Sequence, residues 1–197
     1  MQNNRLQKQL QFILEIDKLK KIVRQSPLTD QSRKENDAEH SWHLAVMAIL
    51  LSEYAKEHHM DIFHVVKLAL IHDLVEIDAG DTFCYDEIGN RQKLERETQA
   101  ADRIFNILPQ DQAGELRALW DEFEARQTPE ACFAAALDRL QPLLLNYHTQ
   151  GGTWREHGIR RQQVIQRNSP MHDGAPELWE YAQKLIEKAV EKGMLKE

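Results

Sequence analysis

The chain of 197 residues is long enough to bury a hydrophobic core, and its length fits one domain. Its composition, 42% hydrophobic and 29% charged with only 8 glycines and 6 prolines, is typical of a helical protein and predicts an all-α fold. A net charge of −7 argues against a nucleic-acid-binding surface, which needs basic patches. It permits a phosphorylated small molecule as partner, provided that a metal ion or a local arginine supplies positive charge.

The cysteines and the apolar segments predict a cytoplasmic protein without a membrane partner. Cys84 and Cys132 lack the spacing of a metal-binding or disulfide framework, and we expect both to be reduced thiols. Charged residues interrupt the apolar positions of the first 21 residues, unlike the apolar region of a signal peptide. The longest apolar run, LAVMAILL at 44–51, is too short to cross a bilayer.

In the first half of the chain, apolar spacing predicts three helices. The first runs from Leu10 to Val23 and is followed by a polar loop over 25–37. Asn36 or Asp37 is expected to cap a second helix over 38–59. A third begins near Asp61 and carries the apolar stretch 62–77, and a loop over 78–90 follows it.

In the second half, helices are expected over 91–108 and 111–126. Thr128 followed by Pro129 predicts the start of a sixth, strongly apolar helix, which Pro142 can kink. A short helix over 155–168 and a last one over 175–194 complete the chain. The sequence shows no internal repeat and predicts no strand.

The motif HDLVE at 72–76 is the first candidate for chemistry. Neighbouring residues of a helix point about 100° apart, so His72 and Asp73 can both reach one ion beside the helix. Glu76 lies one turn further along the same face. The alternative is a solvated helix end, with Glu76 and Asp78 in water.

Two further residues complete a possible ligand set. Asp138 sits among apolar residues and therefore needs a metal ion, an arginine or several N–H donors as a partner. His40 lies in the first turn of an apolar helix, at the border of the core, and His43 one turn later is an equal candidate by spacing. Two histidines and two aspartates suit a divalent transition metal such as Mn, Co, Fe, Zn or Ni.

Four short motifs carry a family resemblance. EHS at 39–41, HDLVE at 72–76, GD at 80–81 and ALDRL at 136–140 follow one another in the order found in the HD-domain metal-dependent phosphohydrolases. Within that family the chain resembles the YfbR-like 5'-deoxynucleotidase branch, from about Arg24 to Tyr147. The resemblance implies a single HD domain over 1–197, a helical bundle with its core at about 24–147 and a helical extension at 151–197. It also implies a homodimer.

The resemblance also implies roles for individual residues. The implied metal ligands are His40, His72, Asp73 and Asp138. Glu76 and Asp81 are implied to be catalytic, and Arg24, or Arg33 as a second candidate, to contact the substrate phosphate. The nucleotidases have a tryptophan after that arginine which helps to select deoxyribose, whereas this chain has Gln25, Ser26 and Pro27 there. A preference for deoxyribose is therefore not implied.

The function predicted from these residues is metal-dependent hydrolysis of a phosphate monoester, most simply a (deoxy)nucleoside 5'-monophosphate. Glu76 would orient or deprotonate the attacking water, Asp81 would protonate the leaving alkoxide or assist the water, and Arg24 would bind the non-bridging oxygens. One alternative is an HD hydrolase of another phosphoester, such as a nucleoside triphosphate. The other is a non-catalytic helical scaffold with a structural metal, although such sites are often rich in cysteine and need no spare carboxylates.

Overall fold

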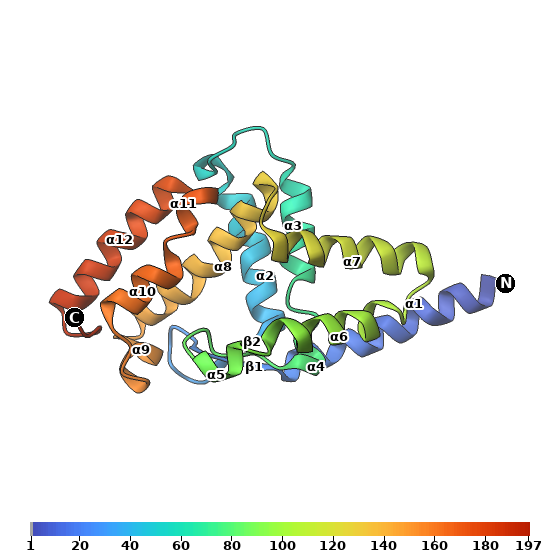
Figure 1. Cartoon of the computed structure of the whole chain (residues 1–197), viewed down its shortest axis with the longest axis horizontal. Helices are drawn as coiled ribbons and strands as arrows, with labels where there is room; N and C mark the ends of the chain where they lie inside the picture. Colours follow the sequence, from blue (N-terminus) through green and yellow to red (C-terminus); the bar gives the residue numbers. More distant parts are fainter. Residues whose placement is uncertain (1) are drawn as a thin grey trace.

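The computed structural model of the protein describes residues 2–197, with side chains from residue 4 onward (Figure 1). The main helices are α1 (Gln2–Ile16), α2 (Asp37–Leu50), α3 (Ile62–Ile71), α6 (Lys93–Phe105), α7 (Gln110–Ala125), α8 (Pro129–His148), α10 (Arg161–Asn168) and α12 (Pro176–Glu191). The shorter elements are a 3-10 turn (Asp17–Lys21), strands β1 (Val23–Pro27) and β2 (Lys34–Asn36), a second 3-10 turn (Ser52–Tyr54), and helices α4 (Glu76–Ala79), α5 (Glu87–Asn90), α9 (Gly152–Glu156) and α11 (Met171–Gly174). The prediction of an all-α fold is confirmed, apart from one short hairpin.

Helix α8 is the central element. It packs against α2, α3 and α7 on one side and against the C-terminal helices α10, α11 and α12 on the other (Figure 1). Thr128 caps its N-terminus by accepting a hydrogen bond from the amide of Ala131 at 3.2 Å, as its position before Pro129 predicts. The helix is continuous through Pro142. Because its apolar side chains Phe133, Leu137 and Leu140 are buried, α8 fixes the positions of Asp138 and Gln141 on the same helix.

A second, smaller core lies on the N-terminal side. There α1, α6 and α7 enclose Leu74 and Val75, together with Phe12, Ile104 and Trp120. The chain thus passes at 72–75 from the larger core, to which Leu68 and Ala69 belong, into this smaller core. None of the helices that the structure describes is long and apolar enough to cross a membrane.

The first helix does not extend to Val23, and the absence of strands was a wrong prediction. The backbone is extended from Ile22 onward, and β1 pairs antiparallel with β2, with Val23 opposite Asn36 and Pro27 opposite Lys34. The β-branched pair Ile22–Val23 favours an extended backbone, and Pro27 restricts its predecessor to the β region. This hairpin brings Arg24 to the N-terminal end of α2. Asn36 then caps α2 in a capping box with Glu39.

The third predicted helix is interrupted. Helix α3 ends at Ile71, and residues 72–75 form tight turns in which amides bond three residues back, as from Leu74 to Ile71 at 3.1 Å and from Glu76 to Asp73 at 3.0 Å. In 3-10 geometry the side chains of residues three apart point in the same direction. Asp73 and Glu76 are therefore better aligned with each other than they would be in an α-helix. The second helix likewise ends at Leu50 rather than at 59, and the helix predicted over 155–168 is divided into α9 and α10 at Gly158, whose φ is +64°.

Replacing Gly174 with alanine should destabilise the protein by about 1–3 kcal/mol, because a Cβ there would overlap the Cys132 carbonyl where α11 crosses α8. Urea denaturation measures the change. The matched control is Gly114→Ala in α7, where an added Cβ meets no atom within 4 Å and alanine favours the helix. Equal midpoints for the two variants would contradict this interpretation of the α8–α11 contact.

Candidate active site

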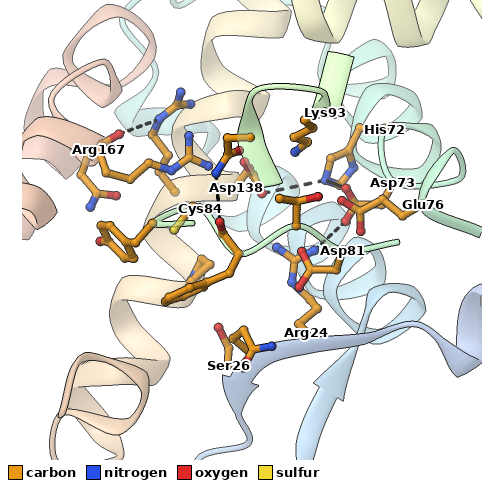
Figure 2. Close-up of a pocket in the computed structure, with 18 of the residues that line it drawn as sticks. Arg24, Ser26, His72, Asp73, Glu76, Asp81, Cys84, Lys93, Asp138 and Arg167 are labelled. Atoms are coloured by element: carbon orange, nitrogen blue, oxygen red, sulfur yellow. Dashed lines mark hydrogen bonds and ion pairs between the residues drawn. The ribbon is translucent and has the colours of Figure 1, made fainter. Parts of the chain in front are cut away.

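A pocket of about 350 Å³ opens between β1, the loop after α4, the start of α6, and helices α8 to α10. Six of the seven predicted site residues line it: Arg24, His72, Asp73, Glu76, Asp81 and Asp138. The seventh, His40, lies directly behind, with its Nε2 atom 3.1 Å from Oδ1 of Asp138. Figure 2 shows Arg24, Asp73, Asp81 and Asp138 turned toward the same space. The fold thus brings together residues that are as much as 114 positions apart, from Arg24 to Asp138.

His72 is oriented to offer one ring nitrogen to a ligand. Its Nδ1 donates a hydrogen bond to the carbonyl of Ala69 at 2.8 Å, which places the proton on that atom and leaves the lone pair on Nε2. Nε2 is buried without a hydrogen-bond partner, 3.0 Å from Oδ1 of Asp73 and 3.9 Å from Oδ1 of Asp138. An unpaired imidazole nitrogen between two carboxylates fits a divalent metal ion.

His40, and not His43, faces this cluster. Its Nδ1 donates to Oε1 of Gln141 at 3.1 Å, while its Nε2 faces Asp138 and lies 3.9 Å from Asp73. His43 lies on the other side of Gln141, with Nδ1 3.3 Å from the Gln141 amide nitrogen. Burial lowers the pKa of His40, so its ring is neutral and suited to bind a cation. Asp138 pairs with the histidines and not with an arginine, the alternative partner.

Gln141 and Glu35 lie behind His40 and fix the orientation of its ring, a role that was not predicted from the sequence. The Gln141 side-chain amide donates to Oε1 of Glu35 at 2.7 Å, which holds its carbonyl oxygen toward His40. Burial raises the pKa of Glu35 to about 7. Gln141 follows Asp138 by three positions on one helix, and this spacing could have identified it.

Replacing Gln141 with leucine should weaken the binding of a divalent metal ion at this cluster by about 10- to 100-fold, because His40 loses the acceptor that fixes its ring. Equilibrium dialysis against Mn²⁺ or Zn²⁺ measures the affinity, and His43→Gln is the matched control because it changes the other contact of Gln141. An unchanged affinity in the leucine variant would show that Gln141 only fills space.

Arg24 is held by two carboxylates. Its Nη1 lies 2.9 Å from Oδ2 of Asp73 and 3.2 Å from Oδ1 of Asp37, a residue that sequence reasoning considered only as a helix cap. Burial alone would raise the pKa of Asp73, but the neighbouring His72 ring and Arg24 guanidinium outweigh the effect of burial and lower this pKa. The other candidate, Arg33, is exposed and pairs with Glu39, outside the pocket.

Glu76 and Asp81 border the same space. Glu76 is only 3% exposed, and its Oε2 is buried without a partner. Burial, reinforced by the charges of Asp73 and Asp37, raises the pKa of Glu76 well above its ordinary value. Asp81 follows Gly80, whose φ of +74° turns the chain back toward the pocket, and burial raises the pKa of Asp81 too. Glu76 is thus not in a solvated helix end.

The far end of the pocket is formed by the C-terminal part of the chain, which the sequence analysis left without a role. Trp154 and Arg167 line it together with Arg139 of α8 and Cys84 and Tyr85 of the loop. Figure 2 shows Arg167 extending into the pocket beside Cys84. Burial and the nearby charges of Arg167 and Arg126 lower the pKa of Arg139 to about 10. Nothing in the short-range spacing of the sequence indicates that these residues meet.

The chain belongs to the HD domain family, whose pattern matches residues 16–179. The resemblance inferred from the four motifs is thereby confirmed. The match extends beyond position 147, to the C-terminal helices that line the pocket.

Individual proteins that are similar to this chain support the assignment to the HD domain family. A crystal structure of a predicted metal-dependent phosphohydrolase from Magnetospirillum magnetotacticum MS-1 superposes with a TM-score of 0.95 and is 53% identical, covering 100% of this chain and 98% of that one. The 5'-deoxynucleotidases HDDC2 of Homo sapiens and Bos taurus are 33% and 32% identical over 136 residues, which are 68% of this chain. The matched region spans 65% of the human protein and 64% of the bovine one, slightly less than two thirds of these curated relatives.

Proposed function

We propose that the protein is a metal-dependent phosphohydrolase that cleaves a phosphate monoester, most simply a (deoxy)nucleoside 5'-monophosphate, to nucleoside and phosphate. The observation that carries the proposal is the unpaired, buried Nε2 of His72 among two carboxylates, in a pocket that also contains Arg24. The names of the relatives, a metal-dependent phosphohydrolase and 5'-deoxynucleotidases, support it.

The proposed metal ligands are His40, His72, Asp73 and Asp138. The histidine rings already have their other nitrogens engaged with Gln141 and Ala69, as is usual for metal-binding histidines. Two imidazoles and two carboxylates suit Mn, Co, Fe, Zn or Ni. When bound, such an ion lowers the pKa of its water toward 7 and polarises a phosphoryl oxygen.

Three residues of the chain would act on the substrate. The Arg24 guanidinium can bind two non-bridging phosphate oxygens at once, and Asp37 and Asp73 hold it at the pocket wall. Glu76 is placed to orient the attacking water and take its proton. Asp81, with its raised pKa, is suited to give a proton to the leaving alkoxide.

Replacing Asp81 with asparagine should reduce kcat by about 10²- to 10⁴-fold for substrates with a poor leaving group, because the proton donor is lost. Hydrolysis of p-nitrophenyl phosphate, whose leaving group needs no proton, should fall much less. Metal content measured by elemental analysis should stay at the wild-type level. Loss of the metal would instead assign Asp81 to the metal site.

The function is tested by phosphate release from a panel of 5'-mononucleotides, ribo and deoxy, with Mn²⁺, Co²⁺ or Zn²⁺ added after chelator treatment. Metal-dependent release from at least one nucleotide is the expected result. Because Gln25 and Ser26 line the pocket at the positions where the resemblance to the nucleotidases implies a tryptophan, the panel also shows whether the sugar is selected. Bound metal without release from any phosphoester would favour the scaffold with a structural metal.

Three further properties are part of the proposal. We infer that the HD core and the helices from 151 onward act as one domain, since Trp154 and Arg167 line the pocket. A homodimer is supported by the apolar side chains that α1 leaves exposed: Leu6, Leu10, Ile13 and Leu14. A cytoplasmic location is supported by the two free cysteines. Light scattering after size-exclusion chromatography tests the dimer.

A further inference from the structure

Two arginines at the far end of the pocket form no ion pair with any described carboxylate. Arg139 is only 5% exposed, and Arg167 reaches into the pocket beside Cys84 (Figure 2). Among the described side chains, no carboxylate oxygen lies within 4.0 Å of either guanidinium. Arg24, at the other end of the same pocket, pairs with two carboxylates. A buried charge is costly without a partner, so Arg139, which lies beside the half-buried Arg167, needs an explanation.

The protein fixes Arg139 without neutralising it. Its Nε donates to the carbonyl of Arg167 at 3.1 Å, and its Nη1 donates to the carbonyl of Ala135 at 2.9 Å. These neutral acceptors orient the guanidinium, and no described group accepts from its remaining nitrogen. The neighbouring Cys84 is a free thiol, and its pKa is raised from the ordinary value although Arg167 attracts the thiolate.

We propose that Arg139 and Arg167 form a second anion-binding site, which holds a phosphate or carboxylate group of the substrate at the end opposite the phosphate that is cleaved. This inference rests on the proposed function and deepens it: among the phosphate monoesters that the pocket accepts, those with a second anionic group are expected to bind more tightly. A planar guanidinium matches such a group with two parallel hydrogen bonds. A nucleobase carbonyl could accept these hydrogen bonds as well, but it would leave both positive charges uncompensated.

The site is tested first without catalysis. Inorganic phosphate is titrated by calorimetry into chelator-treated wild type and three variants, Arg167→Gln, Arg24→Gln and Arg161→Gln. The last is the matched control, because Arg161 lies on the same helix and pairs with Glu187 outside the pocket. We expect saturable binding that is at least tenfold weaker in Arg167→Gln and unchanged in Arg161→Gln. A parallel titration with acetate shows whether the site prefers phosphate or carboxylate.

Other results would overturn the proposal: no binding to wild type, or binding that depends on Arg24 and not on Arg167. Arg139→Gln is the secondary variant, since its burial puts folding at risk. A second experiment measures hydrolysis and compares kcat/KM for a nucleoside 3',5'-bisphosphate with kcat/KM for the 5'-monophosphate. The ratio should fall at least tenfold in Arg167→Gln through KM and should stay unchanged in the control Arg161→Gln. If the wild type hydrolyses nothing, the proposed function fails, while the phosphate titration still decides on the anion site.

Discussion

Replacing Asp73 with alanine should remove both the metal and the activity. Asp73 contacts three members of the site: its carboxylate is 3.0 Å from Nε2 of His72, 2.9 Å from Nη1 of Arg24 and 3.9 Å from Nε2 of His40. Because even a supporting residue behind a ligand is worth about 10- to 100-fold in metal affinity, loss of a ligand should weaken binding by at least about 100-fold. Phosphate release should fall to the level of the chelated wild type.

Elemental analysis after dialysis and a phosphate-release assay measure the two effects. Asp78→Ala is the matched control, because Asp78 lies in the same segment but pairs with Arg103 at the surface, where an ion pair contributes about 0–1 kcal/mol. Asp73→Asn keeps the shape of the side chain and separates loss of charge from loss of packing. Full metal content in both Asp73 variants would place the metal elsewhere.

Replacing Glu76 with glutamine should stop turnover while the metal stays bound. The substitution preserves shape but removes the base, and general bases contribute about 10²- to 10⁴-fold to the rate. We therefore expect kcat to fall by that factor with metal content unchanged. Oε2 of Glu76 is buried without a hydrogen-bond partner, and Glu76 lines the pocket, which is consistent with a role toward water.

The result with Glu76→Gln also distinguishes between two possible sets of metal ligands. Besides the cluster of His40, His72 and Asp73, the carboxylates of Asp37, Asp73 and Glu76 lie close enough together to hold an ion, with ligand atoms within 4.8 Å of one another. Arg24 already supplies a cation to Asp37 and Asp73. If Glu76→Gln lost metal as fully as Asp73→Ala, Glu76 would be a ligand and the division of roles proposed here would be wrong.

Much of the helical architecture followed from the sequence alone. The caps at Asn36 and Thr128 and the apolar spacing of 129–148 are local signals, which act between residues a few positions apart. The order of the motifs around His40, His72 and Asp138 is itself enough to indicate the HD family. The caps and the apolar spacing depend on chemistry within one helix, and each motif is a short run of residues that can be read without its partners.

The tertiary structure determines which residues from distant parts of the chain come into contact. Only the β1–β2 hairpin brings Arg24 rather than Arg33 to Asp73, and only packing across α8 selects His40 over His43 and sets Gln141 behind it. The tight turns at 72–75 lie where the chain passes from the larger core into the smaller one. The pairing of Arg139 with Arg167 joins residues 28 positions apart in different helices. Such contacts depend on how helices pack, and local spacing carries no information about the partner across the interface.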